Sequence, residues 1–302
     1  MDSLKLKWQS KLAWQSKVVL LLVLPVVGAG LVLETHWWAT QELPVAIWTL
    51  GLSLLLALAV LKLRAATPTG AAAGASITAG LMFSTAAFPY QPWHTALPPV
   101  LAVSLLAWGA TRLGRTKKEA LGTAEKRQGR SAAQVAANLG VAALVFTEVV
   151  QSWLTDAGWF ARSGAGTALV FALGLAALAE AAADTVSSEV GQVLGGRPRM
   201  ITTLRAVDAG TDGAVSVAGT LAGVAAAGVV AGIGTLALRG GLGLFWISAA
   251  SGAFGLLFDS LLGATLERHK WLNNDAVNFL STTAAAGFAL VLMVVLPHAG
   301  VG

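Results

Sequence analysis

Acidic, basic and glycine residues alternate through one stretch of the sequence, 184–220. The stretch contains four carboxylates (Asp184, Glu189, Asp208, Asp212), three arginines (Arg197, Arg199, Arg205) and several glycines, among them Gly191, Gly195, Gly196, Gly210 and Gly213. Carboxylates suit Mg²⁺, arginines bind phosphate oxygens in pairs, and glycines let backbone N–H groups approach an anion. The composition of this stretch is therefore typical of a site that handles phosphate groups.

Polar and small residues recur at helical spacing in four apolar segments, which places each set on one helix face. The four sets are Arg130, Gln134 and Asn138; Glu180, Asp184, Ser188 and Gly191; Ser248, Gly252, Gly255, Asp259 and Gly263; and Asn274, Asn278 and Ser281. Ionisable groups inside a membrane are energetically costly and mark a function by default. We therefore expect the four polar faces to lie at one depth, facing the cytoplasm.

Several other kinds of site are disfavoured by the sequence. It contains no Cys, which removes thiolate catalysis and Cys-ligated metals. The phosphate-loop motif GxxxxGKS/T, the protein-kinase HRD and DFG motifs and the zinc motif HExxH are absent. Of the four His residues, only His269 is expected on the inner side, so Ser187 and Ser188 lack a nearby base for a serine hydrolase.

The composition indicates the elements that position these residues. Of 302 residues, 56% are hydrophobic and only 12% are charged, and the mean hydropathy is +0.71. A membrane helix needs about 20 apolar residues, and the long apolar runs exclude a β-barrel. The sequence thus predicts an all-α, polytopic membrane helix bundle with about nine spans: 18–33, 43–63, 71–88, 96–111, 131–150, 164–183, 214–238, 242–263 and 276–296.

The positions of the basic residues predict the orientation. With a cytoplasmic N-terminus and an outer C-terminus, 18 of the 20 Lys and Arg residues fall inside, all but Arg162 and Arg239. Residues 1–17, with a tandem WQSK, are predicted to form a cytoplasmic interfacial amphipathic segment. Residues 18–302 are predicted to form a single transmembrane catalytic domain with cytoplasmic loops at 112–130, 185–213 and 264–275. Gly219, Gly223, Gly228 and Gly232 are expected to be helix-packing positions.

Five ordered motifs resemble the phytyl-phosphate-kinase-like family of integral membrane proteins. They are DTVSSEVG at 184–191, PRMITT at 198–203, GTDGAVS at 210–216 followed by Gly219 and Thr220, FDSLLGATLE at 258–267 and NNDAVNFLST at 273–282. The resemblance extends back to RQGRSAAQVAANLG at 127–140. The layout is also distantly similar to dolichol kinase, phytol kinase and phosphatidate cytidylyltransferase, which use CTP. Where the family would show DTW and ASE, this chain has DTV and SSE, and neither change removes a ligand.

The resemblance implies a Mg²⁺-dependent kinase that converts a membrane isoprenoid monophosphate (phytyl, geranylgeranyl or farnesyl phosphate) into the diphosphate. The expected phosphoryl donor is a nucleoside triphosphate, with CTP preferred. The site is expected on the cytoplasmic side of a bacterial, archaeal or organelle membrane, and no nucleic-acid partner is expected. A prenol kinase, a cytidylyltransferase-like enzyme and an ion or solute transporter remain alternatives, although alternating access favours a site near the bilayer centre.

Within this hypothesis each residue receives a role. Asp184 and Asp259 hold Mg²⁺, with Glu189 and Asp212 as second candidates, and Arg199 and Asn278 join the two aspartates as catalytic residues. The predicted phosphate- and nucleotide-binding set is Arg130, Asn138, Ser188, Arg197, Thr202, Gly210, Thr211, Gly213 and Asn274. On an ideal helix Glu189 points about 140° away from Asp184. Glu189 therefore joins the site only if the helix unwinds before Gly191.

Overall fold

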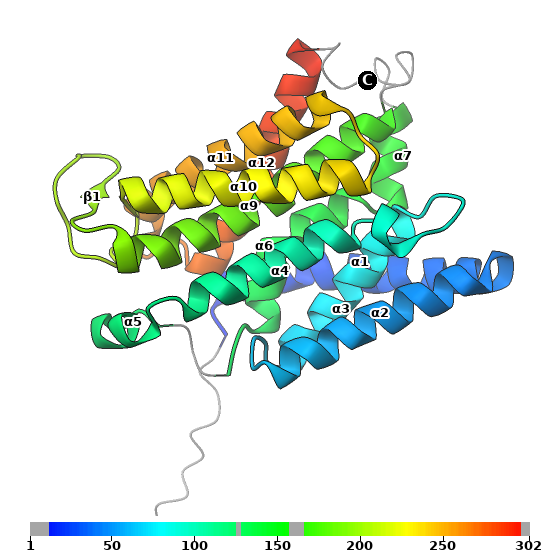
Figure 1. The fold of residues 1–302 in the computed structure, drawn as a ribbon, viewed down its shortest axis with the longest axis horizontal. Coiled ribbons are helices and arrows are strands. Elements are labelled where there is room, and N and C mark those ends of the chain that lie inside the picture. Colours follow the sequence, from blue (N-terminus) through cyan, green and yellow to red (C-terminus); the bar gives the residue numbers. More distant parts are fainter. Residues whose placement is uncertain (1–11, 125–127, 157–165, 297–302) are drawn as a thin grey trace, which may run out of the picture.

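The computed structural model describes residues 12–124, 128–156 and 166–296 and confirms an all-α bundle (Figure 1). In chain order the elements are α1 (Trp14–Gln41), α2 (Leu43–Lys62), α3 (Pro68–Ser84), η1 (Pro92–His94), α4 (Leu97–Arg112), α5 (Arg115–Leu121), α6 (Ala132–Val145), α7 (Glu148–Asp156), α9 (Gly166–Leu194), β1 (Arg199–Met200), β2 (Ala214–Val215), α10 (Val217–Ala237), α11 (Leu242–Leu262), the π-helical turn η2 (Gly263–Glu267) and α12 (Asn274–Val295). The strands form one antiparallel pair, with Arg199 opposite Val215 and Met200 opposite Ala214.

Each of the nine predicted spans contains a helix, but not every helix is long enough to cross a membrane. Among the described residues, six helices are long and apolar enough: α1, α2, α9, α10, α11 with η2, and α12. Two bent pairs, α4 with α5 at 67° and α6 with α7 at 50°, raise the number to as many as eight. Helix α3 has only 17 residues. The number of spans and the sides on which the termini lie stay predictions.

Two predicted boundaries were wrong. Helix α9 continues to Leu194, so the first ten residues of the predicted loop 185–213 are helical. Helix α10 begins at Val217, not near Ala214, because Ser216 caps it by accepting a hydrogen bond from Gly219 N at 3.1 Å. Of the predicted interfacial segment 1–17, residues 1–11 lie outside the described residues, while residues 14–17 form the first turn of α1.

Helix α9 is the central element of the bundle. It packs against α4, α6, α10, α11 and α12, and Figure 1 shows α10 lying along it. The middle of α9 is rich in Ala, and small residues allow membrane helices to approach closely. A Cβ on Gly223 of α10 would lie 2.7 Å from the carbonyl oxygen of Ala183. A Cβ on Gly219 would lie 2.7 Å from the carbonyl oxygen of Ser187, whereas a Cβ on Gly228 would meet no atom within 4 Å. The predicted packing role is thus confirmed for Gly219 and Gly223.

The first and last described helices are joined by side-chain hydrogen bonds. Ser16 Oγ of α1 donates to Asp275 Oδ2 at 2.5 Å, and Asn273 Nδ2 donates to Ser16 Oγ at 2.7 Å. Asn273 also caps α12 by accepting a hydrogen bond from Ala276 N at 3.1 Å. The start of α1 is therefore fixed to the start of α12.

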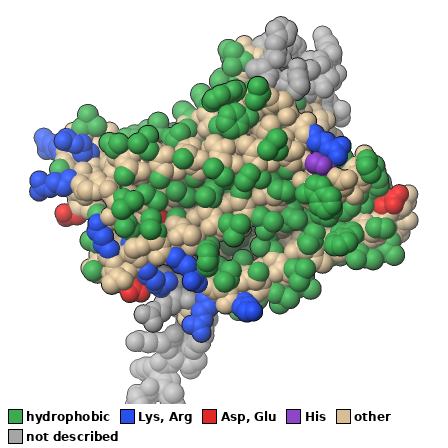
Figure 2. Space-filling view, viewed as in Figure 1, with side chains coloured by type: hydrophobic (Ala, Val, Ile, Leu, Met, Phe, Trp, Pro, Cys, Tyr) green, Lys and Arg blue, Asp and Glu red, His purple; other side chains and the backbone are tan. Residues whose placement is uncertain are grey.

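The surface separates apolar from basic side chains. Leu21, Leu54 and Leu105 are each more than half exposed, as expected of side chains that face lipid. Figure 2 shows Lys and Arg side chains gathered mainly at the end of the molecule that carries α5 and β1. This gathering agrees with the charge pattern from which the orientation is predicted.

Candidate active site

Close packing of α9 against α11 brings three carboxylates together. A Cβ on Gly255 of α11 would lie 2.4 Å from Cγ of Glu180, and a Cβ on Gly252 would lie 2.8 Å from Cβ of Ala179. The small residues of α11 thus leave room for the Glu180 side chain. They also allow Asp259, which lies one turn after Gly255 on α11, to approach Asp184 of α9.

The charges of Glu180, Asp184 and Asp259 act on one another, and Asp184 and Asp259 are close enough to share a hydrogen bond. Asp259 Oδ2 and Glu180 Oε1 are buried and have no hydrogen-bond partner among the described residues. Like charges at such short range destabilise one another, so the cluster needs a shared proton or a nearby cation. Arg130 is close enough for its charge to act on Asp184.

Four carboxylate residues line a cavity of about 290 Å³ at the basic end of the molecule: Asp184, Asp212, Asp259 and Glu267. We call it the acid cavity. Helix α11 is followed by the π-helical turn η2, in which backbone hydrogen bonds join residues five apart instead of four. Through this turn Glu267 lines the same cavity as Asp259.

A second cavity, of about 200 Å³, lies beside the acid cavity and is lined by amide side chains. We call it the amide cavity. Its amide-bearing residues are Gln134, Asn138, Gln192, Asn274 and Asn278. Asn278 Nδ2 donates to Asn138 Oδ1 at 3.5 Å, and Asn138 Nδ2 donates to the Gln134 carbonyl at 2.8 Å. The two cavities share the lining residues Thr123, Asp184, Ser188, Gln192 and Asn274, so they form one continuous polar site.

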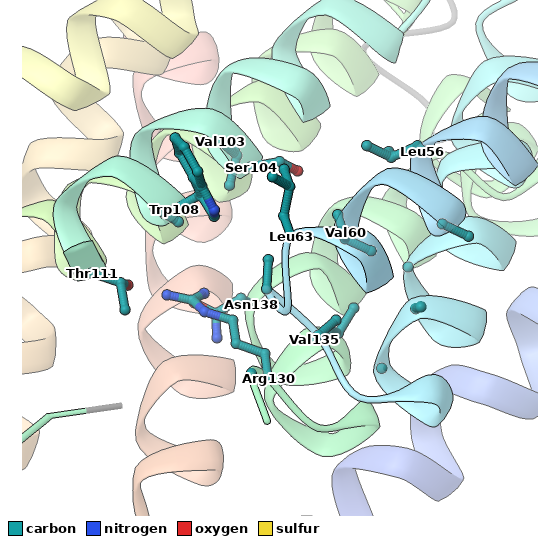
Figure 3. A pocket seen from close by; sticks show the side chains of 18 of the residues that line it. Leu56, Val60, Leu63, Val103, Ser104, Trp108, Thr111, Arg130, Val135 and Asn138 are labelled. Atoms are coloured by element: carbon teal, nitrogen blue, oxygen red, sulfur yellow. The ribbon is translucent and has the colours of Figure 1, made fainter. Parts of the chain in front are cut away.

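Arg130 stands where the amide cavity meets a third, apolar cavity, which it also lines together with Asn138 (Figure 3). Its backbone is fixed by hydrogen bonds to the connection between α2 and α3: Arg130 N donates to Ala65 O at 3.0 Å, and Thr67 N donates to Arg130 O at 2.9 Å. Its side-chain Nη2 donates to Thr185 Oγ1 at 3.2 Å. Arg130 is therefore held beside the carboxylate of Asp184.

The glycine-rich loop before α10 closes the acid cavity. Gly210, Thr211 and Gly213 line this cavity, as their predicted role in binding a nucleotide requires. Gly213 has a φ of +76°, and a Cβ on it would lie 2.2 Å from Ala264 N of η2. Only glycine fits there, so this residue also serves to bring the loop against η2.

Four predicted site residues lie elsewhere than expected. Arg197, Arg199 and Thr202 are exposed and line none of the three cavities, and Arg199 Nη1 donates to the Leu204 carbonyl at 2.8 Å. Because α9 stays helical past Gly191, Glu189 is turned away from the acid cavity and lines only the amide cavity. The structure brings together Asp184, Asp212, Asp259, Ser188, Asn138, Asn274, Asn278 and Arg130.

Glu189 pairs instead with a buried lysine. Lys118 Nζ of α5 lies 2.5 Å from Glu189 Oε2 and also donates to the carbonyls of Ala110 (3.0 Å) and Thr111 (2.7 Å) at the end of α4. The Lys118 side chain is 1% exposed and that of Glu189 is 13% exposed. This ion pair joins the bent α4–α5 pair to the central helix.

We predict that Lys118→Met destabilises the protein by about 3 kcal/mol, because it leaves Glu189 without its partner in a site shielded from water. Thermal unfolding in detergent measures the change. The neighbouring exposed Lys117 donates to the Val193 carbonyl, and Lys117→Met should shift the melting temperature far less. The double variant Lys118→Met with Glu189→Met should recover much of the loss. Equal melting temperatures for Lys118→Met and the unmodified protein would contradict the assignment.

Two carboxylates, Glu180 and Glu267, are absent from the predicted site residues. The sequence pattern places Glu180 on the same helix face as Asp184, but only the structure shows its burial to 1% exposure. Glu267 lies within the FDSLLGATLE motif, but its position depends on the π-helical turn.

The donor set fits a metal ion that is shared with a substrate. Within the described part of the chain, no group of three or more Asp, Glu or His residues is placed to hold a metal by itself. Mg²⁺ is usually bound by one or two carboxylates together with substrate phosphates and water. Asp184 and Asp259, with the unpartnered Oδ2 of Asp259, match that requirement.

Fold and cavities together define a polytopic integral membrane protein with a continuous polar site at its basic end. The chain belongs to the family described as integral membrane protein DUF92, whose family model matches residues 51–286. The family assignment made from the five motifs is thereby confirmed.

Curated relatives agree with this membership. The chain is 36% identical over 200 residues to an uncharacterised membrane protein of Synechocystis sp., and the match covers 63% of this chain and 71% of that protein. It is 31% identical over 199 residues to protein VTE6, a chloroplastic protein of Arabidopsis thaliana, covering 64% of this chain and 57% of VTE6. An uncharacterised membrane protein of Methanocaldococcus jannaschii is 33% identical over 108 residues, 36% of this chain and 45% of that protein. No solved structure gives a significant match.

Proposed function

We propose that this protein transfers the terminal phosphoryl group of a nucleoside triphosphate to the phosphate of a membrane isoprenoid monophosphate. The observation that carries the proposal is the continuity of the acid and amide cavities, with Asp184 shared by both and Arg130 at the far side of the amide cavity. A donor triphosphate and an acceptor phosphate can then meet beside Asp184. The motifs shared with phytyl-phosphate-kinase-like proteins support the same reaction.

In this reaction an acceptor phosphate oxygen attacks the terminal phosphorus of the nucleotide. The bond from that phosphorus to its bridging oxygen breaks, and the products are an isoprenoid diphosphate and a nucleoside diphosphate. A phosphate monoester has its second pKa near ~6 and is mostly a dianion at neutral pH. The attack therefore needs no strong base, which suits a site lined by amides and carboxylates.

Phosphoryl transfer depends on positioning and on neutralising charge. Asp184 and Asp259 are the residues that would hold Mg²⁺, which supplies positive charge to the phosphates when bound. Arg130 contributes a fixed positive charge at the acceptor side, and Asn138 and Asn278 orient phosphate oxygens through their amide N–H groups. By the charge pattern of the sequence, the site faces the cytoplasm.

Purified protein with Mg²⁺ and farnesyl, geranylgeranyl or phytyl phosphate should form the diphosphate from a labelled nucleotide, with CTP tested before ATP. Label in the terminal phosphate must appear in the lipid product, whereas a cytidylyltransferase-like enzyme would transfer label from the innermost phosphate. Free prenols in parallel reactions identify a prenol kinase. No labelled lipid from any nucleotide, together with ion uptake into liposomes that Asp184→Ala abolishes, would replace the kinase by a transporter.

A further inference from the structure

The apolar cavity is the largest of the three and is not explained by phosphate chemistry alone. It has a volume of about 370 Å³ and lies between α2, α3, α4 and α6. Its walls are mainly Ala, Val and Leu with two helical glycines, Gly70 and Gly74. Figure 2 shows the face of the molecule hollowed between α4 and α2.

One end of this cavity is strongly basic. Four arginines line it (Arg64, Arg112, Arg115 and Arg130), and its lining contains no carboxylate among the described residues. Arg112 lies 4.5 Å from the centre of the Trp108 ring and donates through Nη2 to the Leu63 carbonyl at 3.0 Å. The Arg115 side chain pairs with Glu119.

An unused hydrogen-bond donor is present at the same end. Trp108 Nε1 is buried and has no partner among the described residues. Figure 3 shows Trp108 and Arg130 entering the cavity from different elements. A buried N–H without a partner is costly, and an anionic oxygen placed between Trp108 and Arg130 would satisfy it.

We propose that this cavity holds the hydrocarbon chain of the acceptor, with its phosphate between Trp108, Arg130 and Asn138, and that Gly74 sets the length of chain that fits. The inference rests on the proposed function, because that function supplies the acceptor. Charge complementarity supports this occupant: a dianionic head group meets the arginines, and an apolar tail meets the Ala, Val and Leu walls.

The dimensions suit a single hydrocarbon chain lying within one leaflet. Along α4 the lining runs from Val100 to Arg112, which spans about 18 Å of helix. That length is about half of the hydrocarbon core of a bilayer, which is ~30 Å thick. The phosphate would then lie at the membrane surface, next to the amide cavity, with the tail directed towards the bilayer centre.

Gly74 of α3 is the position at which the cavity can be narrowed without disturbing the fold. A Cβ on Gly74 would meet only Val135 Cγ1, at 3.8 Å, so a larger side chain there enters the cavity. A Cβ on Gly80 of the same helix would meet no atom within 4 Å, and Gly80 does not line the cavity. The pair Gly74→Leu and Gly80→Leu therefore compares the same substitution inside and outside the cavity.

We expect Gly74→Leu to lower kcat/KM for geranylgeranyl and phytyl phosphate at least tenfold relative to geranyl phosphate. Gly80→Leu should keep the chain-length profile of the unmodified protein. A photoreactive geranylgeranyl phosphate provides a readout independent of turnover: it should label peptides of α3 and α4, and Gly74→Leu should abolish this labelling while Gly80→Leu retains it. Competition by phosphatidic acid as strong as that by geranylgeranyl phosphate would assign the cavity to a phospholipid instead.

The two proposals fail in different ways. If diphosphate forms but Gly74→Leu leaves the chain-length profile unchanged and the label maps elsewhere, the cavity is not the acceptor site and the kinase stands. If labelling maps to α3 and α4 and is blocked by Gly74→Leu, but no nucleotide gives diphosphate, the cavity binds the isoprenoid and the proposed reaction is wrong.

Discussion

Asp184→Asn should lower the rate of phosphoryl transfer by about 10³-fold, the largest effect expected of any single substitution in this chain. Asp184 lines both polar cavities and lies against Asp259. The amide keeps the size of the side chain but removes the charge that a bound Mg²⁺ requires. Single-turnover measurement at saturating Mg²⁺ and nucleotide tests the prediction.

The same substitution should leave the fold at least as stable. Burial disfavours a charged carboxylate at position 184, and a neutral amide of the same size does not carry this cost. A melting temperature that is unchanged or higher, combined with lost activity, separates a catalytic from a structural role. Asp208 is exposed and lines none of the three cavities, and Asp208→Asn is the matched control. Activity of Asp184→Asn within tenfold of the control would refute the assignment.

Arg130→Gln should raise the KM for the isoprenoid phosphate by about 100-fold, because a hydrogen bond to a charged group is worth roughly 1.5–3 kcal/mol. Arg130 lies between the apolar and amide cavities, and its backbone is fixed to the α2–α3 connection. Arg130→Lys keeps the charge but not the paired donors, so its KM should lie between those of Arg130→Gln and the unmodified protein. Steady-state kinetics with varied acceptor at saturating nucleotide provides the measurement.

Arg239→Gln serves as the control for Arg130, since Arg239 is exposed and lies beyond the C-terminal end of α10. It should change no kinetic constant. If Arg130→Gln affected only the KM of the nucleotide, Arg130 would belong to the donor side of the site and the arrangement of the two substrates would be reversed.

Sequence patterns predicted the helices and their polar faces because both follow from spacing along one chain. The spacing of Asn274 and Asn278, or of Glu180 and Asp184, determines a shared helix face whatever the neighbouring helices are. The length of α9 was underestimated because its last residues, from Asp184 onward, are polar and resemble a loop. Their helical state depends on packing against α10, through contacts such as that of Gly219 with Ser187.

The positions of Arg197 and Arg199 outside the three cavities have a different origin. The composition of the loop shows only that it contains arginines. The β1–β2 pair fixes the backbone of Arg199, and the Arg199 side chain donates a hydrogen bond to the Leu204 carbonyl. The Lys118–Glu189 pair could not be predicted either. It requires the 67° bend between α4 and α5, which occurs at Gly114 with a φ of +56°. Neither the bend angle nor the choice of partner is encoded in local spacing.

The hydrogen bonds that join Ser16 to Asp275 and Asn273 bear on the order in which the protein matures. During synthesis α1 emerges long before α12, so this junction waits for nearly the whole chain to be inserted. Asn274, which lines both polar cavities, lies inside that junction. A nascent chain that has inserted α9 and α11 already carries the clustered carboxylates but still has an incomplete site. Competence to bind the proposed nucleotide should therefore arise late, after all helices of the bundle have been inserted into the membrane.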